Sequence, residues 1–246
     1  MGPPHMGLVD LHCHLLWALD DGVESAEEAV AAARLLSSLG FTDAAPSPHA
    51  NPEWPSGDEA RCEARRGELR GLLQAEGIPL ALHRNAENKL DEEFLARAEG
   101  PARRGVGESQ RWALVELPFR GGVPALPDLV FRLRRKGVSP LFAHPERCAE
   151  FEKPGRAEEV VRLGGALQLN VASLIGLYGK TPRKLAERFL SEGLYAVAAT
   201  DLHHPAGAEE WIPEALDALE KRVGRQAFDA LLSEHPRRVL LGEELP

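Results

Sequence analysis

The chain has 246 residues, a formal net charge of −9 and 43% hydrophobic residues, a composition typical of a globular protein with one large core. No apolar run approaches the roughly 18 residues of a membrane span, so we expect no membrane insertion. The acidic balance argues against a general nucleic-acid binder, whose surface is usually basic. Three cysteines without paired spacing predict no disulfide framework and suit the reducing cytoplasm.

The chain is expected to form one domain over residues 8–246, since single domains of parallel α/β architecture commonly reach this length. Residues 1–7 carry neither a signal-peptide nor a transit-peptide pattern. We interpret them as a tag remnant or a disordered start.

Short apolar runs predict seven strands, at 8–12, 42–46, 80–84, 112–117, 139–144, 166–171 and 195–200. Amphipathic segments predict helices at 25–40, 58–75, 124–136, 156–163, 181–192, 213–222 and 225–233, the first capped by Ser25. Strand followed by helix, repeated along the chain, predicts an α/β fold with parallel strands, either a closed barrel or an open doubly wound sheet. The Gly/Arg-rich stretch 99–111 is expected to be a surface loop, with a nucleic-acid contact as the alternative.

Histidines and carboxylates gather where the predicted strands end. They are His12, His14, Asp21, His49, Glu87, Glu116, His144, Asp201 and His203. In parallel α/β barrels, functional residues collect at the carboxyl ends of the strands. Imidazole and carboxylate groups are ligands that Mn, Fe, Co and Zn accept, and nine such residues exceed the needs of one ion.

Taken singly, these residues also have structural interpretations. His144 could be a hydrogen-bonded loop histidine and Glu87 a surface acid. Glu116 argues for a cation, because it stands in the apolar run ALVELP, where an unpaired carboxylate is costly. His12 and His14 are two positions apart, so their side chains point the same way along a strand.

The chain contains, in this order, the stretches DLHCHLLWALDDG, PSPHA, RNAEN, ALVELP, FAHPERC and AATDLHH. With these stretches, residues 8 to about 205 resemble the polymerase-and-histidinol-phosphatase (PHP) superfamily. Within it, they most resemble the bacterial protein-tyrosine phosphatases of capsule and exopolysaccharide clusters, the CpsB/CapC type. The resemblance implies a distorted (β/α)7 barrel with three divalent metal ions. Manganese is the expected metal, with iron, cobalt or zinc as alternatives.

The resemblance also implies a ligand set for each ion. The first ion would be held by His12, His14, Glu87 and Asp201, the second by Glu87, Glu116 and His144, and the third by Asp21, His49 and His203. The segment after His49, ANPEWPSGDE, departs from the pattern, because it lacks the basic residues or second histidine expected there. This difference bears on peptide recognition rather than on metal binding.

Three divalent ions and four ligand carboxylates would leave the loaded site positive, so it could attract a phosphate dianion. Clustered divalent ions suit phosphomonoester hydrolysis by direct attack of water. The competing thiolate chemistry needs an arginine six positions after a cysteine. Those positions hold Leu19, Glu68 and Pro154, so we expect Cys13, Cys62 and Cys148 to be packing residues.

Four further residues are candidates with open alternatives. Arg147 could clamp phosphate, because its guanidinium binds two oxygens at once, or form a salt bridge at a helix start. Trp17 could stack on an aromatic ring of the substrate or pack the loop. Asn170 could orient substrate or cap a turn. Asp20 could accept a hydrogen bond from a ligand histidine.

Three functions follow from these observations. The first is a phosphatase that acts on phosphotyrosine of a bacterial tyrosine autokinase, its partner in capsule or exopolysaccharide export. The second is a phosphatase for a small metabolite such as histidinol phosphate. The third is a non-catalytic metal- or kinase-binding module, which predicts eroded ligands and is disfavoured because all nine positions are filled. The sequence leaves the metal, the phosphoprotein and the oligomeric state open.

Overall fold

The apolar runs of the sequence form parallel strands in the structure, a computed structural model that describes residues 7–54, 57–100 and 103–246. The strands are β1 (Leu8–Cys13), β2 (Phe41–Pro46), β3 (His49–Ala50), β4 (Ala81–Leu82), β5 (Glu87–Lys89), β6 (Trp112–Glu116), β7 (Ser139–Ala143), β8 (Ala166–Asn170) and β9 (Tyr195–Ala199). All seven predicted strands are present, although the one expected at 80–84 is only two residues long. β3 and β5 were not predicted.

The helices are α1 (Ala26–Ser38), α2 (Glu59–Ala75), α3 (Phe94–Glu99), α4 (Leu126–Arg135), α5 (Arg156–Arg162), α6 (Lys180–Ser191), α7 (Ala208–Asp229) and α8 (His235–Leu241). The predicted cap of α1 forms, since Glu28 N donates to Ser25 Oγ at 3.2 Å. The short helix α3 was not predicted.

The C-terminal helices differ from the prediction of two helices at 213–222 and 225–233. Helix α7 already begins at Ala208 and contains Pro213. It is interrupted at Gly224, whose φ of 77° is readily adopted only by glycine. A π-helical turn, Ala230–Glu234, then leads into α8, which the sequence did not reveal.

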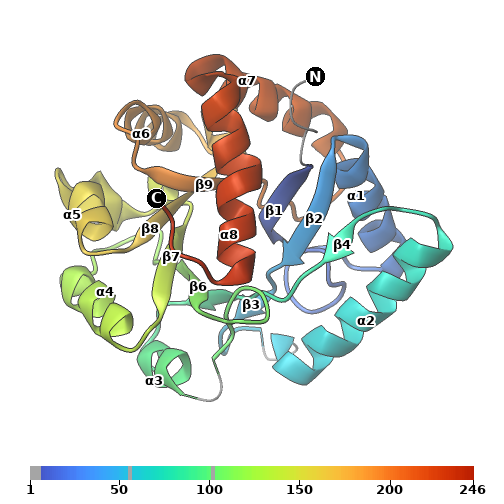
Figure 1. Cartoon of the computed structure of the whole chain (residues 1–246), viewed down its shortest axis with the longest axis horizontal. Coiled ribbons are helices and arrows are strands. Elements are labelled where there is room, and N and C mark those ends of the chain that lie inside the picture. Colours follow the sequence, from blue (N-terminus) through green and yellow to red (C-terminus); the bar gives the residue numbers. More distant parts are fainter. Residues whose placement is uncertain (1–6, 55–56, 101–102) are drawn as a thin grey trace.

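Paired strands run parallel and form two sheets, ordered β1-β2-β4 and β3-β5-β6-β7-β8-β9. Figure 1 shows these strands surrounded by helices, with α8 lying across them in front. The sheets meet beside β1 and β9, where His14 N donates to Leu202 O and Asp201 N donates to His12 O, both at 2.8 Å. The parallel α/β class is confirmed, and full closure of the two sheets into a barrel stays a prediction.

Helix α8 and the residues after it cover the starts of the strands. Val239 completes a buried apolar cluster with residues from six strands, among them Val9, Leu114 and Val197. His235 Nδ1 donates to Ala196 O at 2.7 Å, and the Trp112 indole donates to Glu243 O at 2.9 Å. The C-terminal segment therefore closes one end of the strands, and the opposite end is left for the site.

The first residues and the 99–111 segment were both predicted to be peripheral. The expected tag remnant or disordered start covers residues 1–7, of which residues 1–6 lie outside the described residues. Gly7 is described, and its carbonyl oxygen accepts hydrogen bonds from Ser233 and Arg237, both at 2.9 Å. In the described part of 99–111, Arg103 donates to Ala98 O and Arg104 to Glu59. These internal contacts favour the surface-loop interpretation. Within the described ranges, no helix is both long and apolar enough to span a membrane.

Candidate metal centre

His12 and His14 stand at the carboxyl end of β1, and both are buried. Their ring centroids are 5.5 Å apart, whereas Cys13 between them packs into the hydrophobic core. The alternation expected for a strand therefore holds here. It brings both imidazoles to one side, at the end of the strands that α8 leaves open.

Each of these imidazoles is oriented by a second polar residue. His12 Nδ1 donates to Gln168 Oε1 at 2.8 Å, and His14 Nδ1 donates to Asp20 Oδ2 at 2.8 Å. In the neutral form of either ring, a proton on Nδ1 leaves Nε2 as an electron-pair donor. Both Nε2 atoms are buried and have no hydrogen-bond partner.

Two carboxylates face these nitrogens. Glu87 Oε2 lies 3.3 Å from His12 Nε2 and 3.6 Å from His14 Nε2. Asp201 Oδ1 lies 3.2 Å and 3.6 Å from the same two atoms. Burial disfavours a charged imidazole, but Glu87 and Asp201 outweigh it and raise the pKa of His12 to about 9. Each of the two carboxylates therefore lies within 3.6 Å of both imidazole nitrogens.

Glu87 extends this arrangement toward two more histidines. Its Oε1 lies 3.0 Å from His144 Nε2, and its Oε2 lies 3.1 Å from His49 Nδ1. Glu116 Oε2 lies 4.0 Å from His49 Nδ1. Burial and the neighbouring charge of Glu87 raise the pKa of Glu116 to about 7. A carboxylate pair of this kind is stabilised by a cation between its members.

A third group is more open to solvent. Asp21 Oδ1 lies 3.3 Å from His49 Nε2 and 3.5 Å from His203 Nε2. Hydrogen bonds from His203 and His49 lower the pKa of Asp21 well below its usual range. His14 and His203 stack with ring centroids 4.0 Å apart. Asp21 therefore remains charged at the mouth of the cluster.

The structure brings all nine sequence candidates together. Ligand atoms lie within 4.8 Å of one another in four sets: His14, Asp21, His49 and His203; His12, His14 and Glu87; His12, His144 and Asp201; and His49, Glu87 and Glu116. Of the four ligands expected for the first ion, His12, His14 and Glu87 share one set, whereas Asp201 shares a set with His12 and His144. Glu116 is grouped with His49, and His144 with Asp201, whereas the resemblance implied that Glu116 and His144 share an ion.

The donor set fits divalent metal ions. It consists of imidazoles and carboxylates, and buried nitrogens of His12, His14, His49 and His144 have no hydrogen-bond partner. Unpaired buried polar atoms are costly, so several of them at one place fit a metal-binding site. His144 and Asp201 also have positive φ angles, of 33° and 56°, which non-glycine residues rarely adopt outside functional sites.

Arg147 lies beside this cluster in the short helix after His144. Its Nη1 donates to Asp201 Oδ2 at 2.9 Å, and its guanidinium lies 4.0 Å from the Tyr178 ring centroid and 4.8 Å from that of Phe119. Asn170 Nδ2 donates to the same Asp201 oxygen at 2.9 Å, while its Oδ1 accepts from Ala172 N at 3.0 Å. Asn170 thus caps a turn and also holds a candidate ligand.

Trp17 is placed differently from the substrate-stacking hypothesis. The Arg65 guanidinium lies 4.6 Å from its ring centroid, and the ring packs against the hydrophobic core. A cavity of about 420 Å³ that reaches Asp21, His49 and Glu116 is lined instead by Trp54 and Phe119. This placement favours the loop-packing alternative for Trp17. Trp54 stands in the stretch ANPEWPSGDE, and the departure of this stretch from the family pattern could have drawn attention to Trp54.

All three cysteines are buried. Burial raises the pKa of Cys148 to about 13 and that of Cys13 well above its usual range. Reactive cysteines are accessible and carry lowered pKa values. The packing interpretation of the cysteines agrees with these properties.

The model of the family described as "Capsular polysaccharide synthesis, CpsB/CapC" matches residues 8–241. The chain belongs to this family. Among CpsB/CapC relatives, it is 27% identical to the tyrosine-protein phosphatase YwqE of Bacillus subtilis, covering 97% of this chain and 93% of that protein. It is also 27% identical to the putative tyrosine-protein phosphatase CapC of Staphylococcus aureus, covering 80% and 77%.

The fold agrees with a solved structure of the CpsB/CapC family. A crystal structure from the work on Bacillus subtilis YwqE and Streptococcus pneumoniae CpsB, described as metal-dependent tyrosine phosphatases, superposes with a TM-score of 0.88 and 27% identity. The match covers 97% of this chain and 96% of that one. The predicted resemblance to the CpsB/CapC type is therefore confirmed.

Proposed function

We propose that this chain is a metal-dependent phosphatase that removes phosphate from phosphotyrosine in proteins. The observation that carries the proposal is the Glu87-centred cluster, in which nine candidate ligands converge and four buried imidazole nitrogens lack partners. The relatives YwqE and CapC, named as tyrosine-protein phosphatases, support the same reaction.

The proposed site holds three divalent ions, with manganese expected and iron, cobalt or zinc as alternatives. His12, His14, Glu87 and Asp201 are proposed for the first ion, Glu87, Glu116 and His144 for the second, and Asp21, His49 and His203 for the third. Bound divalent ions supply Lewis acidity and lower the pKa of water for attack on phosphorus. Glu87 has one oxygen toward His144 and the other toward His12, which supports a bridging role.

The chain's own residues prepare this site. Asp20 and Gln168 hold the two β1 imidazoles in the tautomer that leaves Nε2 free. Arg147 is proposed to bind the phosphate, because its guanidinium offers two parallel donors and is held between the Phe119 and Tyr178 rings. Asn170 is proposed to keep Asp201 in position. No protein nucleophile is needed, since water attacks directly.

The proposed substrate is the phosphotyrosine of a tyrosine autokinase that acts in capsule or exopolysaccharide synthesis, encountered in the cytoplasm. The CpsB/CapC family assignment supports this biological setting.

The test combines elemental analysis with steady-state kinetics. Purified protein should contain about three divalent ions per chain, and kcat/KM should be higher for a phosphotyrosine peptide than for histidinol phosphate. Glu87→Gln, assayed in parallel, controls for contaminating phosphatases. A preference for histidinol phosphate would reassign the substrate to a small metabolite. Activity in protein stripped of all metal would contradict the mechanism itself.

A further inference from the structure

The cavity beside the cluster combines a charged base with an apolar wall. Its volume is about 420 Å³, and its residues include the candidate ligands Asp21, His49 and Glu116. The rest of the lining consists of the apolar residues Trp54, Leu117, Pro118 and Phe119 and the polar residues Asn51, Glu53 and Lys89. This volume lies in the range of small-molecule sites. A phosphate dianion makes no favourable contact with apolar side chains, so Trp54, Leu117, Pro118 and Phe119 are surfaces for the group that carries the phosphate.

The two aromatic rings flank the row of imidazoles. Trp54 stacks on His49, with ring centroids 6.3 Å apart and an interplanar angle of 12°. Phe119 lies beside His144, with ring centroids 5.5 Å apart. His49 and His144 in turn contact His14 and His12, so the imidazoles connect one aromatic ring to the other. A phosphate at the cluster would therefore have an aromatic wall within reach of its ester carbon.

Phe119 is also unusually accessible for a phenylalanine, with 45% of its surface exposed. The Arg147 guanidinium lies 4.8 Å from the centroid of this ring. The exposed part of the ring is available to an apolar group that enters the cavity. Covering such a surface is favourable, because apolar area is removed from water.

We propose that Trp54 and Phe119 form a subsite for the phenyl ring of phosphotyrosine and make the enzyme selective for aryl over alkyl phosphomonoesters. This inference rests on the proposed function and deepens it. A phenyl ring attached to the ester oxygen reaches into the cavity and contacts both aromatic side chains. A serine carbon attached at the same place is too short to do so, and it draws the peptide backbone toward the rim.

The experiment compares kcat/KM for a phosphotyrosine peptide and for a phosphoserine peptide of the same sequence. Trp54→Ala should lower the ratio of the two values about tenfold, because the contact between aromatic rings is lost. Trp54→Phe, which keeps a ring, should retain most of the ratio. Phe119→Ala should lower both values, since Phe119 also contacts Arg147, and should lower the ratio as well. Phe131→Ala is the matched control, because Phe131 is 56% exposed on α4 and does not line the cavity.

A binding measurement gives a readout that does not depend on turnover. Metal-loaded wild type should bind phenylphosphonate more tightly than methylphosphonate in calorimetry, and Trp54→Ala should remove most of that difference at unchanged metal content. If wild type hydrolyses phosphotyrosine but neither variant changes the ratio, the subsite is overturned and the proposed function stands. If metal-loaded wild type hydrolyses neither peptide, the proposed function fails, and a persisting preference for phenylphosphonate would still support the subsite.

Discussion

Asp20 Oδ2 accepts a hydrogen bond from His14 Nδ1 at 2.8 Å, and the opposite nitrogen of the same ring faces Glu87 and Asp201. The same carboxylate also accepts from the backbone of Gly22 and His49, both at 3.0 Å. Asp20 therefore connects the loop after β1 with the start of β3 and fixes the direction in which His14 presents its lone pair.

Asp20→Asn should weaken metal binding by about 10- to 100-fold, because the histidine loses the acceptor that fixes its tautomer. Calorimetric titration of metal-free protein with Mn²⁺ measures the change in metal affinity. Asp43→Asn is the matched control, because Asp43 accepts from His83 at the same distance of 2.8 Å but lies in β2 outside the cluster. Equal affinities in wild type and Asp20→Asn would show that Asp20 does not orient a ligand.

Glu87→Gln should be more damaging than His203→Ala. Glu87 lies within 3.6 Å of His12, His14, His49 and His144, whereas His203 belongs only to the set around Asp21. We expect Glu87→Gln to lose at least two ions per chain and His203→Ala to lose one. Elemental analysis after gel filtration provides the comparison, and equal metal content in the two variants would argue against a bridging role.

Replacing Cys13, Cys62 and Cys148 together by alanine should leave kcat/KM within about tenfold of wild type, a change of roughly 1.4 kcal/mol in barrier. All three thiols are buried, and burial keeps them protonated. The melting temperature should fall, since the side chains pack in the core. Complete loss of activity in a variant that still binds metal would revive a thiol mechanism.

Arg147→Ala should lower kcat/KM by about 100-fold for every phosphomonoester, the effect of removing one donor that faces developing charge. Arg147→Lys should retain only part of the wild-type kcat/KM, because an ammonium group cannot bind two oxygens in parallel. Metal content reports on the alternative role, since Arg147 also donates to Asp201. A loss of metal that matches the loss of activity would assign Arg147 to ligand positioning instead of phosphate binding.

The sequence allowed the fold class and a set of candidate ligands to be predicted, but it did not reveal the shortest strands. His12, Glu116 and His144 could be selected because each interrupts or ends an apolar run, and strand ends converge in parallel α/β proteins. The strands β3 and β5 are two and three residues long, too short for any periodicity. Their positions depend on pairing with neighbours that are distant in the chain.

The contacts that orient the candidate ligands could not be predicted from the sequence for a similar reason. Gln168 contacts His12 across 156 positions of sequence, and only its place within the apolar run ALQLN could have drawn attention to it. Trp17 is a candidate from the sequence because it lies between His14 and Asp21, whereas nothing in the sequence analysis pointed to Trp54. In the structure, tertiary packing turns Trp17 toward Arg65 and leaves Trp54 beside His49.

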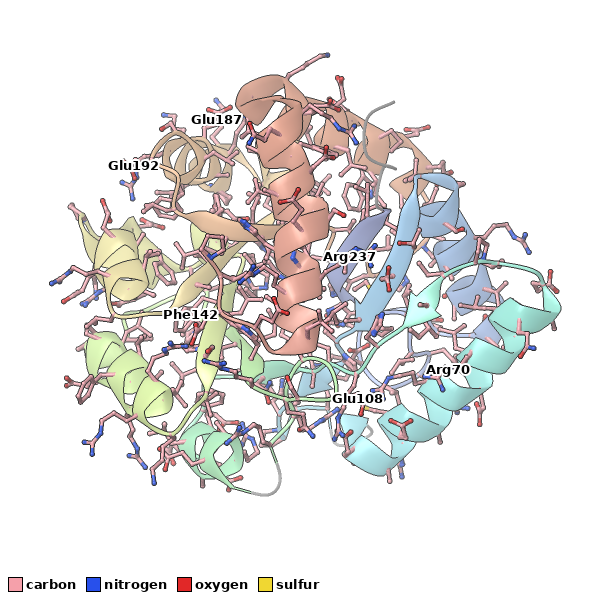
Figure 2. All side chains as sticks on the ribbon, viewed as in Figure 1. Arg70, Glu108, Phe142, Glu187, Glu192 and Arg237 are labelled. Atoms are coloured by element: carbon pink, nitrogen blue, oxygen red, sulfur yellow. The ribbon has the colours of Figure 1, made fainter. Side chains whose placement is uncertain are left out.

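The last prediction concerns how α8 is held over the starts of the strands. Arg237 on α8, labelled in Figure 2, lies 2.9 Å from Asp43 Oδ2 of β2. His83 Nε2 donates to the other oxygen of Asp43 at 2.8 Å. Burial would raise the pKa of Asp43, but hydrogen bonds from His83 and Thr42, together with the charge of Arg237, outweigh it and lower the pKa to about 2.

A carboxylate whose pKa is lower in the folded state than its ordinary value of 3.8 contributes stability above that pH and loses it as the pH falls toward about 2. Asp43→Asn should therefore lower the free energy of unfolding by about 1 kcal/mol at pH 7, since the group is partly solvated. Urea unfolding of wild type and variant, measured from pH 7 to pH 2.5, should give a constant difference above about pH 5 that shrinks below pH 3.8. A difference that stays constant across the whole range would mean that the charge of Asp43 does not hold α8, and that the variant acts through packing alone.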